Sequence, residues 1–393
     1  MEYHFHEVCT VNRLYREKGG RLWFRFNLTK AHNQGSMTIY DFEDCPLSFK
    51  DGSYGGAAGD KIGIIFKDAE WLLKFPKNIK GMDRTGDLSY STSPLSEYIG
   101  SHIFGILGMD AHETELGIRN GKLAVACKDF ATKDDLREIR TIKNRENEEL
   151  SERFGYNLEA TGDQHIVDLE NLLVHIEHNH ILSKITDVEQ RFWEQAVIDI
   201  YINNNDRNNG NWGIIRSREF PDKLAPVFDN GGCLQTKISE NKAEQVLGNI
   251  ELAKKNAINT QTAYGINGHI LSSKRFLDLQ EEYEKLSEAI IRLTPLIKQK
   301  EPEVELLLNN LPSMVFLKNG QAIEVIGDHK RKLFKLQLHE RLEQLLEPAY
   351  ERALELQEDR KHVSVEEILD RIKDQSIGNE YQALPKRNTE WEH

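Results

Sequence analysis

The sequence predicts an α+β protein in two parts, a small part rich in strands followed by a larger helical part. Between residues 47 and 75, short apolar runs alternate with polar turns, as in paired strands. Beyond residue 240, apolar residues recur at helical spacing, most clearly in LFKLQLHERLEQLLEPAYERALEL. The sequence has no internal repeat and no long linker, so we expect the two parts to pack closely.

In the first part, an N-terminal extension differs in character from the residues after Met37. Residues 1–36 are slightly basic, contain the alternating stretch RLWFRF, and end in Gly35-Ser36 before Met37. A Gly-Ser-Met junction is typical of an expression scar, and an appended native strand gives the same pattern. The origin of the extension stays open.

Strand and helix patterns alternate from Leu47 to Phe130. LSFKDG predicts a short strand before a glycine cluster, and KIGIIF and WLLKF predict two strands joined by the turn KDAE. STSPLSEYIGSHIFGILG predicts a helix in which Ser93 is the cap, Pro94 suits the first turn and Gly108 ends the helix. GKLAVACKDF predicts another strand.

The second part opens with a highly charged connection, residues 131–165, that we expect to be helical or mobile. RFWEQAVIDIYI predicts a buried helix that runs directly into NNNDRNNGNWG, residues 203–213, the asparagine-rich loop. NWGIIR and LAPVFD predict a hairpin. The predicted domains are the extension 1–36, an N-terminal part 37–130, a helical part 131–374 and a loose polar tail 375–393.

Composition limits the class of protein. Of the 393 residues, 39% are hydrophobic and 29% are charged, which is ordinary for a globular protein. A net charge of −13 argues against nonspecific binding to nucleic acid or anionic membranes. The four cysteines form no C-x-x-C pair, and no apolar run is long enough for a membrane span or a secretory signal. We therefore expect a cytoplasmic protein with reduced thiols.

The asparagine-rich loop can be a solvated turn, because Asn, Asp and Gly tolerate turn backbones. It also places Asp206 five residues before Asn211. In phosphoryl transfer, a D-x-x-x-x-N pair uses the Asp to orient the acceptor hydroxyl and the Asn to hold a metal ion. Roughly one such pair is expected by chance in a chain of this length, so the spacing needs support from other residues.

A cradle for phosphates is one such support. DGSYGGAAGDK, residues 51–61, lies between two predicted strands, and its small residues let backbone N–H groups approach an anion. It matches neither G-x-x-x-x-G-K-[ST] nor G-x-G-x-x-G, so a flexible hairpin turn explains it equally well.

Lys74 is the candidate cation. In a strand it lies on the opposite face from Trp71 and Leu73. A lysine within an apolar strand is costly unless an anion pairs with it; the alternative is an edge-strand lysine that points to water. Glu97, early in the following helix, can be its partner, although a surface carboxylate near a helix N-terminus explains Glu97 alone.

Asn211 and Asp229 are the candidate metal ligands. PVFDNGG places Asp229 at the end of an apolar strand and before glycines, which resembles the D-F-G aspartate that holds Mg²⁺. A carboxylate, an amide oxygen and phosphates suffice for Mg²⁺. A turn-initiating aspartate is the alternative. The order of helix, Asp206, Asn211, hairpin and Asp229 favours the metal role.

Other polar groups have simpler interpretations. His175, His178 and His180 lack a matching acid or cysteine set, so we expect a polar helix end and not a metal site. Cys127 and Cys233 have no histidine at a recognisable spacing, and we expect small core residues.

Six blocks in collinear order resemble the HipA-like serine/threonine kinases, particularly the compact CtkA-like branch. They are GSYGGAAGDK, WLLKFPK, SPLSEYIGSHIFGILGM, LAVACKDF, NNDRNNGNWG and APVFDNGGCL, and the likeness as a whole runs from about Met37 to about residue 355. The resemblance implies a two-lobed protein-kinase-like fold, with a small β-rich N-lobe, a larger helical C-lobe, and ATP and Mg²⁺ in the cleft.

The resemblance also implies roles. Asp206 would be the catalytic aspartate, Asn211 and Asp229 the metal-binding pair, and Lys74 a contact to the ATP phosphates. The backbone of Lys128, Asp129 and Phe130 would form the hinge beside adenine, and Ser53 would be the loop serine that HipA-like kinases autophosphorylate to silence themselves. The phosphate-binding loop would comprise Ser53, Tyr54, Gly55, Gly56, Ala57 and Ala58.

Two departures qualify the resemblance. The family commonly has His after the Asp-Arg pair, where this chain has Asn208, which puts any role of the ring in doubt. The N-terminal subdomain of full-length HipA has no counterpart in the sequence, as in CtkA-like members. Contacts to a DNA-binding antitoxin therefore cannot be assumed, although an antitoxin-like partner stays open.

These observations lead to one main prediction, an ATP-dependent protein kinase that phosphorylates Ser or Thr on an unidentified protein substrate and on itself. A kinase of a small molecule is the first alternative, because related folds phosphorylate lipids and antibiotics. A noncatalytic nucleotide-binding module that sequesters a partner is the second. A toxin role within a toxin–antitoxin system follows from the resemblance alone.

Overall fold

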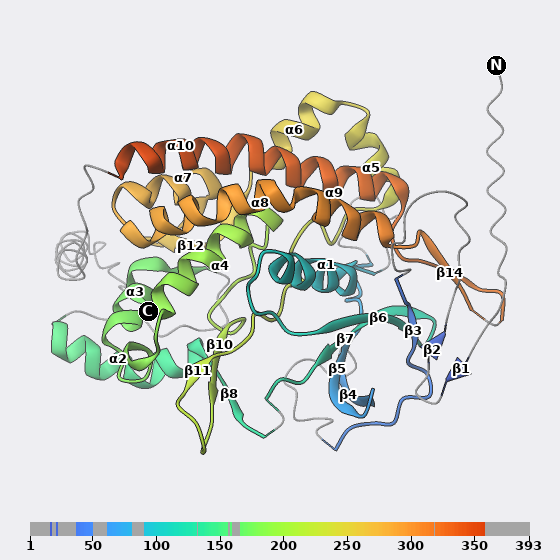
Figure 1. Cartoon of the computed structure of the whole chain (residues 1–393), viewed down its shortest axis with the longest axis horizontal. Helices are drawn as coiled ribbons and strands as arrows, with labels where there is room; N and C mark the ends of the chain where they lie inside the picture. The colour runs from blue at the N-terminus through green and yellow to red at the C-terminus, as the bar shows by residue number, and fades with distance from the viewer. Residues whose placement is uncertain are drawn as a thin grey trace, which may run out of the picture.

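A five-stranded sheet and a set of long helices make up the computed structural model (Figure 1), which confirms the predicted α+β class. The structure describes residues 37–49, 61–80, 90–131, 133–155, 158, 166–317 and 319–357, and the backbone of 16–17 and 21–22. The candidate phosphate-binding residues Ser53, Tyr54, Gly55, Gly56, Ala57 and Ala58, and the tail 375–393, lie outside the described residues.

The five-stranded sheet has the order β3-β6-β7-β5-β4. The hairpins β4–β5 and β6–β7 are antiparallel, β5 and β7 join them, and β3 runs parallel to β6. Lys67 and Asp68, both at positive φ, form the tight turn of the first hairpin. The strands are β3 (Tyr40–Asp41), β4 (Lys61–Phe66), β5 (Ala69–Lys74), β6 (Thr114–Arg119) and β7 (Lys122–Lys128).

The two faces of this sheet have different partners. Trp71 and Leu73 belong to a small core on one face, together with aromatic residues of β3 and β4. Val125 and Cys127 of β7 belong to the main core, and α1 (Ser93–Ile106) packs on β6 and β7. Because side chains alternate along a strand, Lys74 lies on the face opposite Trp71, as predicted.

Two expectations for this part were wrong in detail. LSFKDG forms no strand over its described residues: Leu47 makes a single bridge to Ile64, the N–H of Ser48 donates to the carbonyl of Gly63, and Phe49 is fully exposed. The N-cap of α1 is Thr92 and not Ser93. The Thr92 hydroxyl and N–H both donate to the carbonyl of Thr236, so this helix end is fastened to a distant segment instead of capping itself.

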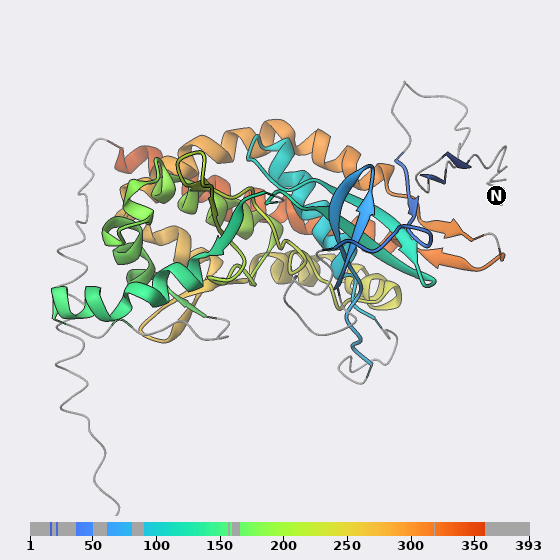
Figure 2. The same ribbon diagram turned by 90° about the horizontal axis from the view of Figure 1, so that it is seen from below.

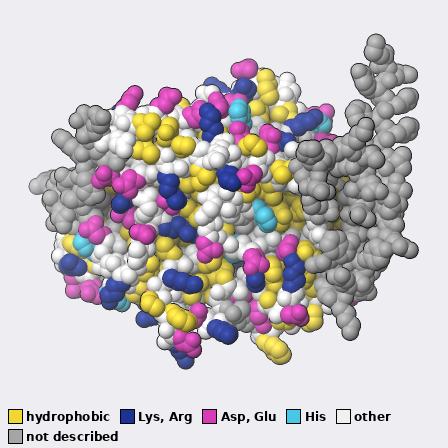
Figure 3. Space-filling model, in the orientation of Figure 1, with side chains coloured by type: hydrophobic (Ala, Val, Ile, Leu, Met, Phe, Trp, Pro, Cys, Tyr) yellow, Lys and Arg dark blue, Asp and Glu magenta, His cyan; other side chains and the backbone are white. Residues whose placement is uncertain are grey.

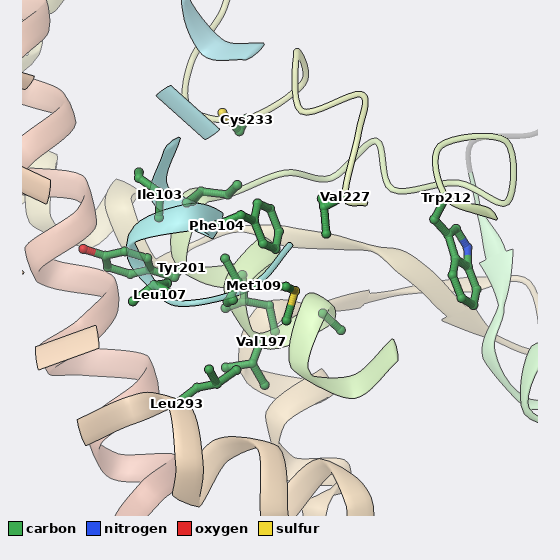
Figure 4. Packing of buried hydrophobic residues seen from close by; sticks show 14 of the residues in the cluster. Ile103, Phe104, Leu107, Met109, Val197, Tyr201, Trp212, Val227, Cys233 and Leu293 are labelled. Carbon is green, nitrogen blue, oxygen red and sulfur yellow. The ribbon is translucent and has the colours of Figure 1, made fainter. Parts of the chain in front are cut away.

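Helices dominate the rest of the described chain. The predicted buried helix is α4, which packs on the long helix α8, and Figure 4 shows residues of α1, α4 and α8 meeting in one core. The sheet and the helices therefore share a continuous core. The helices are α2 (Ile139–Phe154), α3 (Leu169–His178), α4 (Val188–Ile202), α5 (Glu240–Leu247), α6 (Ile250–Ile258), α7 (Ser273–Asp278), α8 (Glu284–Asn310), α9 (Asp328–Arg341) and α10 (Glu347–Leu356), with a π-helical turn at Leu342–Leu346 and 3₁₀ turns at Leu182–Lys184 and Leu279–Glu281.

Short sheets complete the fold. The predicted hairpin after the asparagine-rich loop is present as β10 and β11, although its second arm has only two residues, and β10 also pairs with β8, which was not predicted. The short strands are β1 (Arg16–Glu17), β2 (Arg21–Leu22), β8 (Asp135–Glu138), β9 (Val167–Asp168), β10 (Gly213–Arg216), β11 (Lys223–Leu224), β12 (Gln261–Ile266), β13 (His269–Ser272), β14 (Met314–Phe316) and β15 (Ala322–Glu324).

The arrangement of the layers is visible from two sides. Figure 2 shows the five-stranded sheet at one end of the molecule and the green helices α2 and α3 at the other, with the long helices running between them. On the face in Figure 3, basic and acidic side chains are interspersed. Within the described residues, no helix has the length and apolarity that a membrane span requires.

Candidate active site

The asparagine-rich loop is anchored to the end of α4. Asn203 adopts the left-handed conformation that ends the helix, with φ 54°. The N–H of Asn204 then donates to the carbonyl of Asp199 over 2.7 Å, and its side chain bridges the Asp199 carboxylate and the N–H of Asp206. The loop therefore leaves the helix in one fixed direction.

Two further asparagines hold Asp206. Asn208 donates from its amide to the Asp206 carboxylate over 3.2 Å and accepts from the N–H of Gly210 over 2.8 Å. Asn211 donates from its amide to the carbonyl of Asp206. Because the amide nitrogen of Asn211 is used in this way, its amide oxygen is the atom that remains for a cation.

Asp229 lies beside this loop. Its backbone has φ 60°, a conformation that is uncommon for a residue other than glycine, and its side chain is one-third exposed. Three residues later, Gly232 lies so close to Asp206 that a Cβ on Gly232 would be 2.8 Å from the Asp206 Cβ. The structure thus brings the segment after Asp229 against the loop that carries Asp206 and Asn211.

Lys74 reaches the same place from the sheet. Its Nζ lies 2.8 Å from a carboxylate oxygen of Glu97 and 2.8 Å from one of Asp229. Burial opposes the charge, but the carboxylates of Asp229 and Glu97 outweigh it and hold the pKa of Lys74 well above its usual value. The alternative of a lysine that points to water is wrong, and the expected pairing with Glu97 is present.

Glu97 is buried and fully satisfied. Besides Lys74, it accepts from the N–H of Asn230 over 2.8 Å and contacts Nε2 of His112 over 3.0 Å. Burial disfavours its charge, but Lys74 and His112 prevail and keep the pKa of Glu97 low. Glu97, His112 and the Cys127 thiol lie close together, as a metal site would need. Burial raises the pKa of the Cys127 thiol, and the positive charge that pairs with Glu97 comes from Lys74.

Arg207 organises the site, although no sequence pattern had singled it out. It is completely buried, and its guanidinium makes a two-pronged pair with the Asp199 carboxylate at 2.8 and 3.0 Å. It also donates to the carbonyls of Asn211 and Phe228. Arg207 therefore joins α4, the asparagine-rich loop and the segment before Asp229. The signal in the sequence was Asp199, a carboxylate within the apolar run QAVIDIYI.

The predicted hinge residues lie at the end of β7, which closes with Lys128, and directly after it. The N–H of Lys128 donates to the Glu113 carbonyl and the N–H of Asp129 to the Glu70 carbonyl, each over 2.9 Å. The N–H of Phe130 has no partner among the described residues, and the Phe130 ring lies 5.7 Å from that of Phe228. Of the three hinge N–H groups, that of Phe130 is the one left for a ligand.

The three histidines do not form a metal-binding set. His175 is buried, with Nε2 2.8 Å from the Asn147 side-chain oxygen, whereas His180 is exposed and pairs with Glu146. His178 ends α3 and lies against the ring of Phe154. The interpretation as a polar helix end fits His178 and His180, whereas His175 is a buried residue within α3. Cys127 and Cys233 are buried free thiols, as expected.

His175 should make the protein sensitive to mild acid. Burial, with a smaller effect of Lys143, lowers the pKa of His175 to about 3. The unfolded chain takes up a proton below about pH 6.5, whereas the folded chain does not, so this stabilisation is complete above pH 6.5 and is lost as the pH falls. Lowering the pH to 5 should cost roughly 2 kcal/mol through this residue. Urea unfolding of wild type and His175→Gln at both pH values tests this.

The control is His269→Gln, which removes an exposed imidazole. The difference in unfolding free energy between wild type and His175→Gln should shrink from pH 7.5 to pH 5, while the difference for His269→Gln changes little. A constant difference for His175→Gln would mean that His175 takes up its proton in the folded state.

Comparisons with known proteins extend this picture. No family model matches the chain. It is 29% identical over 357 residues to the serine/threonine-protein kinase CtkA of Helicobacter pylori strain J99, covering 89% of this chain and 99% of that protein. A crystal structure of the Helicobacter pylori proinflammatory kinase CtkA matches with a TM-score of 0.67 and 26% identity, over 81% of this chain and 99% of that one. HipA in a complex with HipB and operator DNA from Shewanella oneidensis MR-1 gives a TM-score of 0.46 at 12% identity, over 85% and 78% of the two chains.

Proposed function

The chain is a homologue of the CtkA-like kinases, and we propose that it is an ATP-dependent protein kinase that phosphorylates serine or threonine. The observation that carries this proposal is the meeting of Lys74, Asp229 and the loop bearing Asp206 at one place. These residues come from β5, from the segment after β11 and from the end of α4. Phosphoryl transfer needs this combination of a cation, metal ligands and an acceptor-positioning carboxylate.

The donor atoms fit ATP with Mg²⁺. One carboxylate oxygen of Asp229 accepts from Lys74, and the other has no hydrogen bond among the described residues. With the amide oxygen of Asn211, it would supply hard oxygen ligands, which is the kind that Mg²⁺ prefers. Bound there with ATP, the ion would neutralise charge on the phosphates. The free N–H of Phe130 would hold the adenine edge.

Each residue then has a defined task. Asp206 orients the acceptor hydroxyl and accepts its proton, and Asn208 holds the carboxylate in place. Asn208, at the position where the family commonly has histidine, thus orients the Asp206 carboxylate in this chain. Lys74, held by Glu97, would contact the phosphates and offset the charge that builds up towards the leaving group.

The proposal also names the group that accepts the phosphoryl group. We propose that it is a hydroxyl on a protein and includes a serine of the chain itself, for which Ser53 is the candidate from the resemblance. Autophosphorylation there would add negative charge to a loop meant to hold phosphates, and like charges repel. A partner of the antitoxin type and a place in the cytoplasm are parts of the same proposal.

The test is transfer of label from γ-labelled ATP in the presence of Mg²⁺, beside an Asp206→Ala variant, with phosphosites mapped by mass spectrometry. Label on serine or threonine in wild type that is lost in the variant is the expected result. Ser53→Ala should remove the self-label if Ser53 is the acceptor.

Other outcomes point to the two alternatives. ATP turnover that depends on Asp206 but labels no protein would indicate a small-molecule acceptor. ATP binding without turnover, with identical behaviour of Asp206→Ala, would indicate a noncatalytic nucleotide-binding module. Either result would overturn the protein-kinase proposal.

A further inference from the structure

Asn230, the residue after Asp229, makes an unusual set of buried contacts. Its side chain is completely buried. The amide nitrogen donates to the hydroxyl of Ser101 over 2.9 Å, and the amide oxygen accepts from the guanidinium of Arg207. Its backbone N–H donates to Glu97 over 2.8 Å. A single residue therefore contacts the ion pair, α1 and the arginine of the asparagine-rich loop.

The contacts of this site suit a neutral amide. Arg207 offers a donor and Ser101 a hydroxyl, and asparagine pairs with both without adding a charge. Aspartate would place a second buried negative charge at the guanidinium that already holds Asp199, and leucine makes neither contact. Buried polar groups that lose their partners pay the cost of desolvation without compensation. In the D-F-G arrangement the corresponding position is apolar, so the buried polar contacts of Asn230 have no counterpart in that motif.

We propose that Asn230 is a positioning residue that couples the Lys74–Glu97 ion pair to the asparagine-rich loop. Through Glu97 it reaches Lys74, and through Arg207 it reaches the carbonyl of Asn211. The inference rests on the proposed function, in which these groups act on ATP and the acceptor. The inference adds that Asn230 sets the position of the Lys74–Glu97 ion pair relative to the asparagine-rich loop.

The segment that follows Asn230 supports this coupling. The Cys233 thiol donates to the carbonyl of Ser96 over 3.1 Å, and Thr236 accepts from Thr92 at the start of α1. Gly100 allows the close approach, since a Cβ there would lie 2.8 Å from the Asn230 Cβ. Residues 230–236 thus lie along the first half of α1, and Asn230 is the point where this contact meets Arg207.

The test compares Asn230→Leu and Asn230→Asp with the control Asn256→Leu, an exposed asparagine of α6. Phosphoryl transfer is measured as separate kcat and KM values for ATP. We expect both Asn230 variants to lower kcat by about tenfold to about a hundredfold and to change KM much less, since leucine unpairs buried polar groups and aspartate adds a buried negative charge near Glu97 and Asp199. The control should leave both values unchanged.

A double-mutant cycle separates positioning from general destabilisation. If Asn230 acts through Ser101, adding Ser101→Ala to Asn230→Leu should lower kcat by less than Ser101→Ala does in wild type. Ser101→Ala should have its full effect beside Asn256→Leu. Equal effects of Ser101→Ala in both backgrounds would overturn the proposed coupling, as would a wild-type kcat in Asn230→Leu.

A readout without nucleotide keeps this inference distinct from the proposed function. Hydrogen exchange of the apoprotein should accelerate together in residues 92–103, 203–213 and 228–236 of Asn230→Leu, while α8 keeps its protection. Acceleration confined to 228–236 would overturn the coupling even if the enzyme is active. If wild type transfers no more phosphate than Asp206→Ala, the proposed function is refuted. The hydrogen-exchange pattern of Asn230→Leu would still show whether Asn230 couples the two parts of the site.

Discussion

Replacing Lys74 by methionine should lower kcat/KM for phosphoryl transfer by roughly 10²–10³-fold. Methionine keeps much of the length and apolar volume of the side chain but removes the charge that faces Glu97 and Asp229. The two carboxylates would then be held close together with no ammonium group between them. Steady-state kinetics against ATP give the measurement, and Lys77→Met, at an exposed position just beyond the same strand, is the matched control.

The same variant makes a prediction about pH. Because the folded pKa of Glu97 is depressed, its stabilisation is present above the ordinary glutamate pKa of about 4.3 and is lost as the pH falls. The difference in unfolding free energy between wild type and Lys74→Met should therefore be full at pH 7 and smaller at pH 3, below the ordinary glutamate pKa. If that difference is the same at both pH values, the ion pair does not stabilise the fold.

Replacing Arg207 by methionine should lower the free energy of unfolding by roughly 3–5 kcal/mol, because the Asp199 carboxylate would stay buried without its partner. The carbonyls of Asn211 and Phe228 would lose a donor as well, so the site should lose activity in molecules that remain folded. Arg207→Lys should rescue little, since an ammonium group cannot reproduce the two-pronged pair. Urea unfolding and kinetics at saturating ATP measure the two effects.

Two controls make this result specific. Arg218→Met removes an exposed arginine and should change neither stability nor rate. Adding Asp199→Leu to Arg207→Met removes the unpaired carboxylate and should recover part of the stability but none of the activity. Full recovery of activity in the double variant would show that Arg207 serves only to neutralise Asp199.

Local patterns were enough to predict the elements that hold the site, but not its internal contacts. The alternation in WLLKF correctly gave the face of Lys74, and the apolar run before the asparagine-rich loop correctly gave α4. Lys74 and Asp229 are 155 residues apart, and only the tertiary fold brings them together. The assigned roles of these residues, and the domain boundaries, stay predictions.

The residues that were not foreseen share a physical cause. Arginine and asparagine are residue types that usually lie at the surface, so the sequence does not mark Arg207 and Asn230 as buried. Their buried hydrogen bonds are made with partners from distant segments. Strands such as β8 and β13 were not predicted because their sequences, DLRE and HILS, are too short and too polar to show a clear alternation. The cap of α1 was misplaced by one residue because the Thr92 hydroxyl donates to the Thr236 carbonyl and caps no N–H of its own helix.

The burial of Asn230 has a consequence for chemical ageing. Asparagine before glycine is prone to deamidate, because the backbone nitrogen of the unhindered glycine can attack the side-chain carbonyl. Asn230-Gly231 is such a pair, yet its amide is enclosed and held by Arg207 and Ser101. Asn120-Gly121, Asn267-Gly268 and Asn319-Gly320 are the same pair in turns where the asparagine is exposed. Stored in its folded form, the protein should deamidate first at these outer turns, and conversion of Asn230 to aspartate would have to wait until the site itself opens.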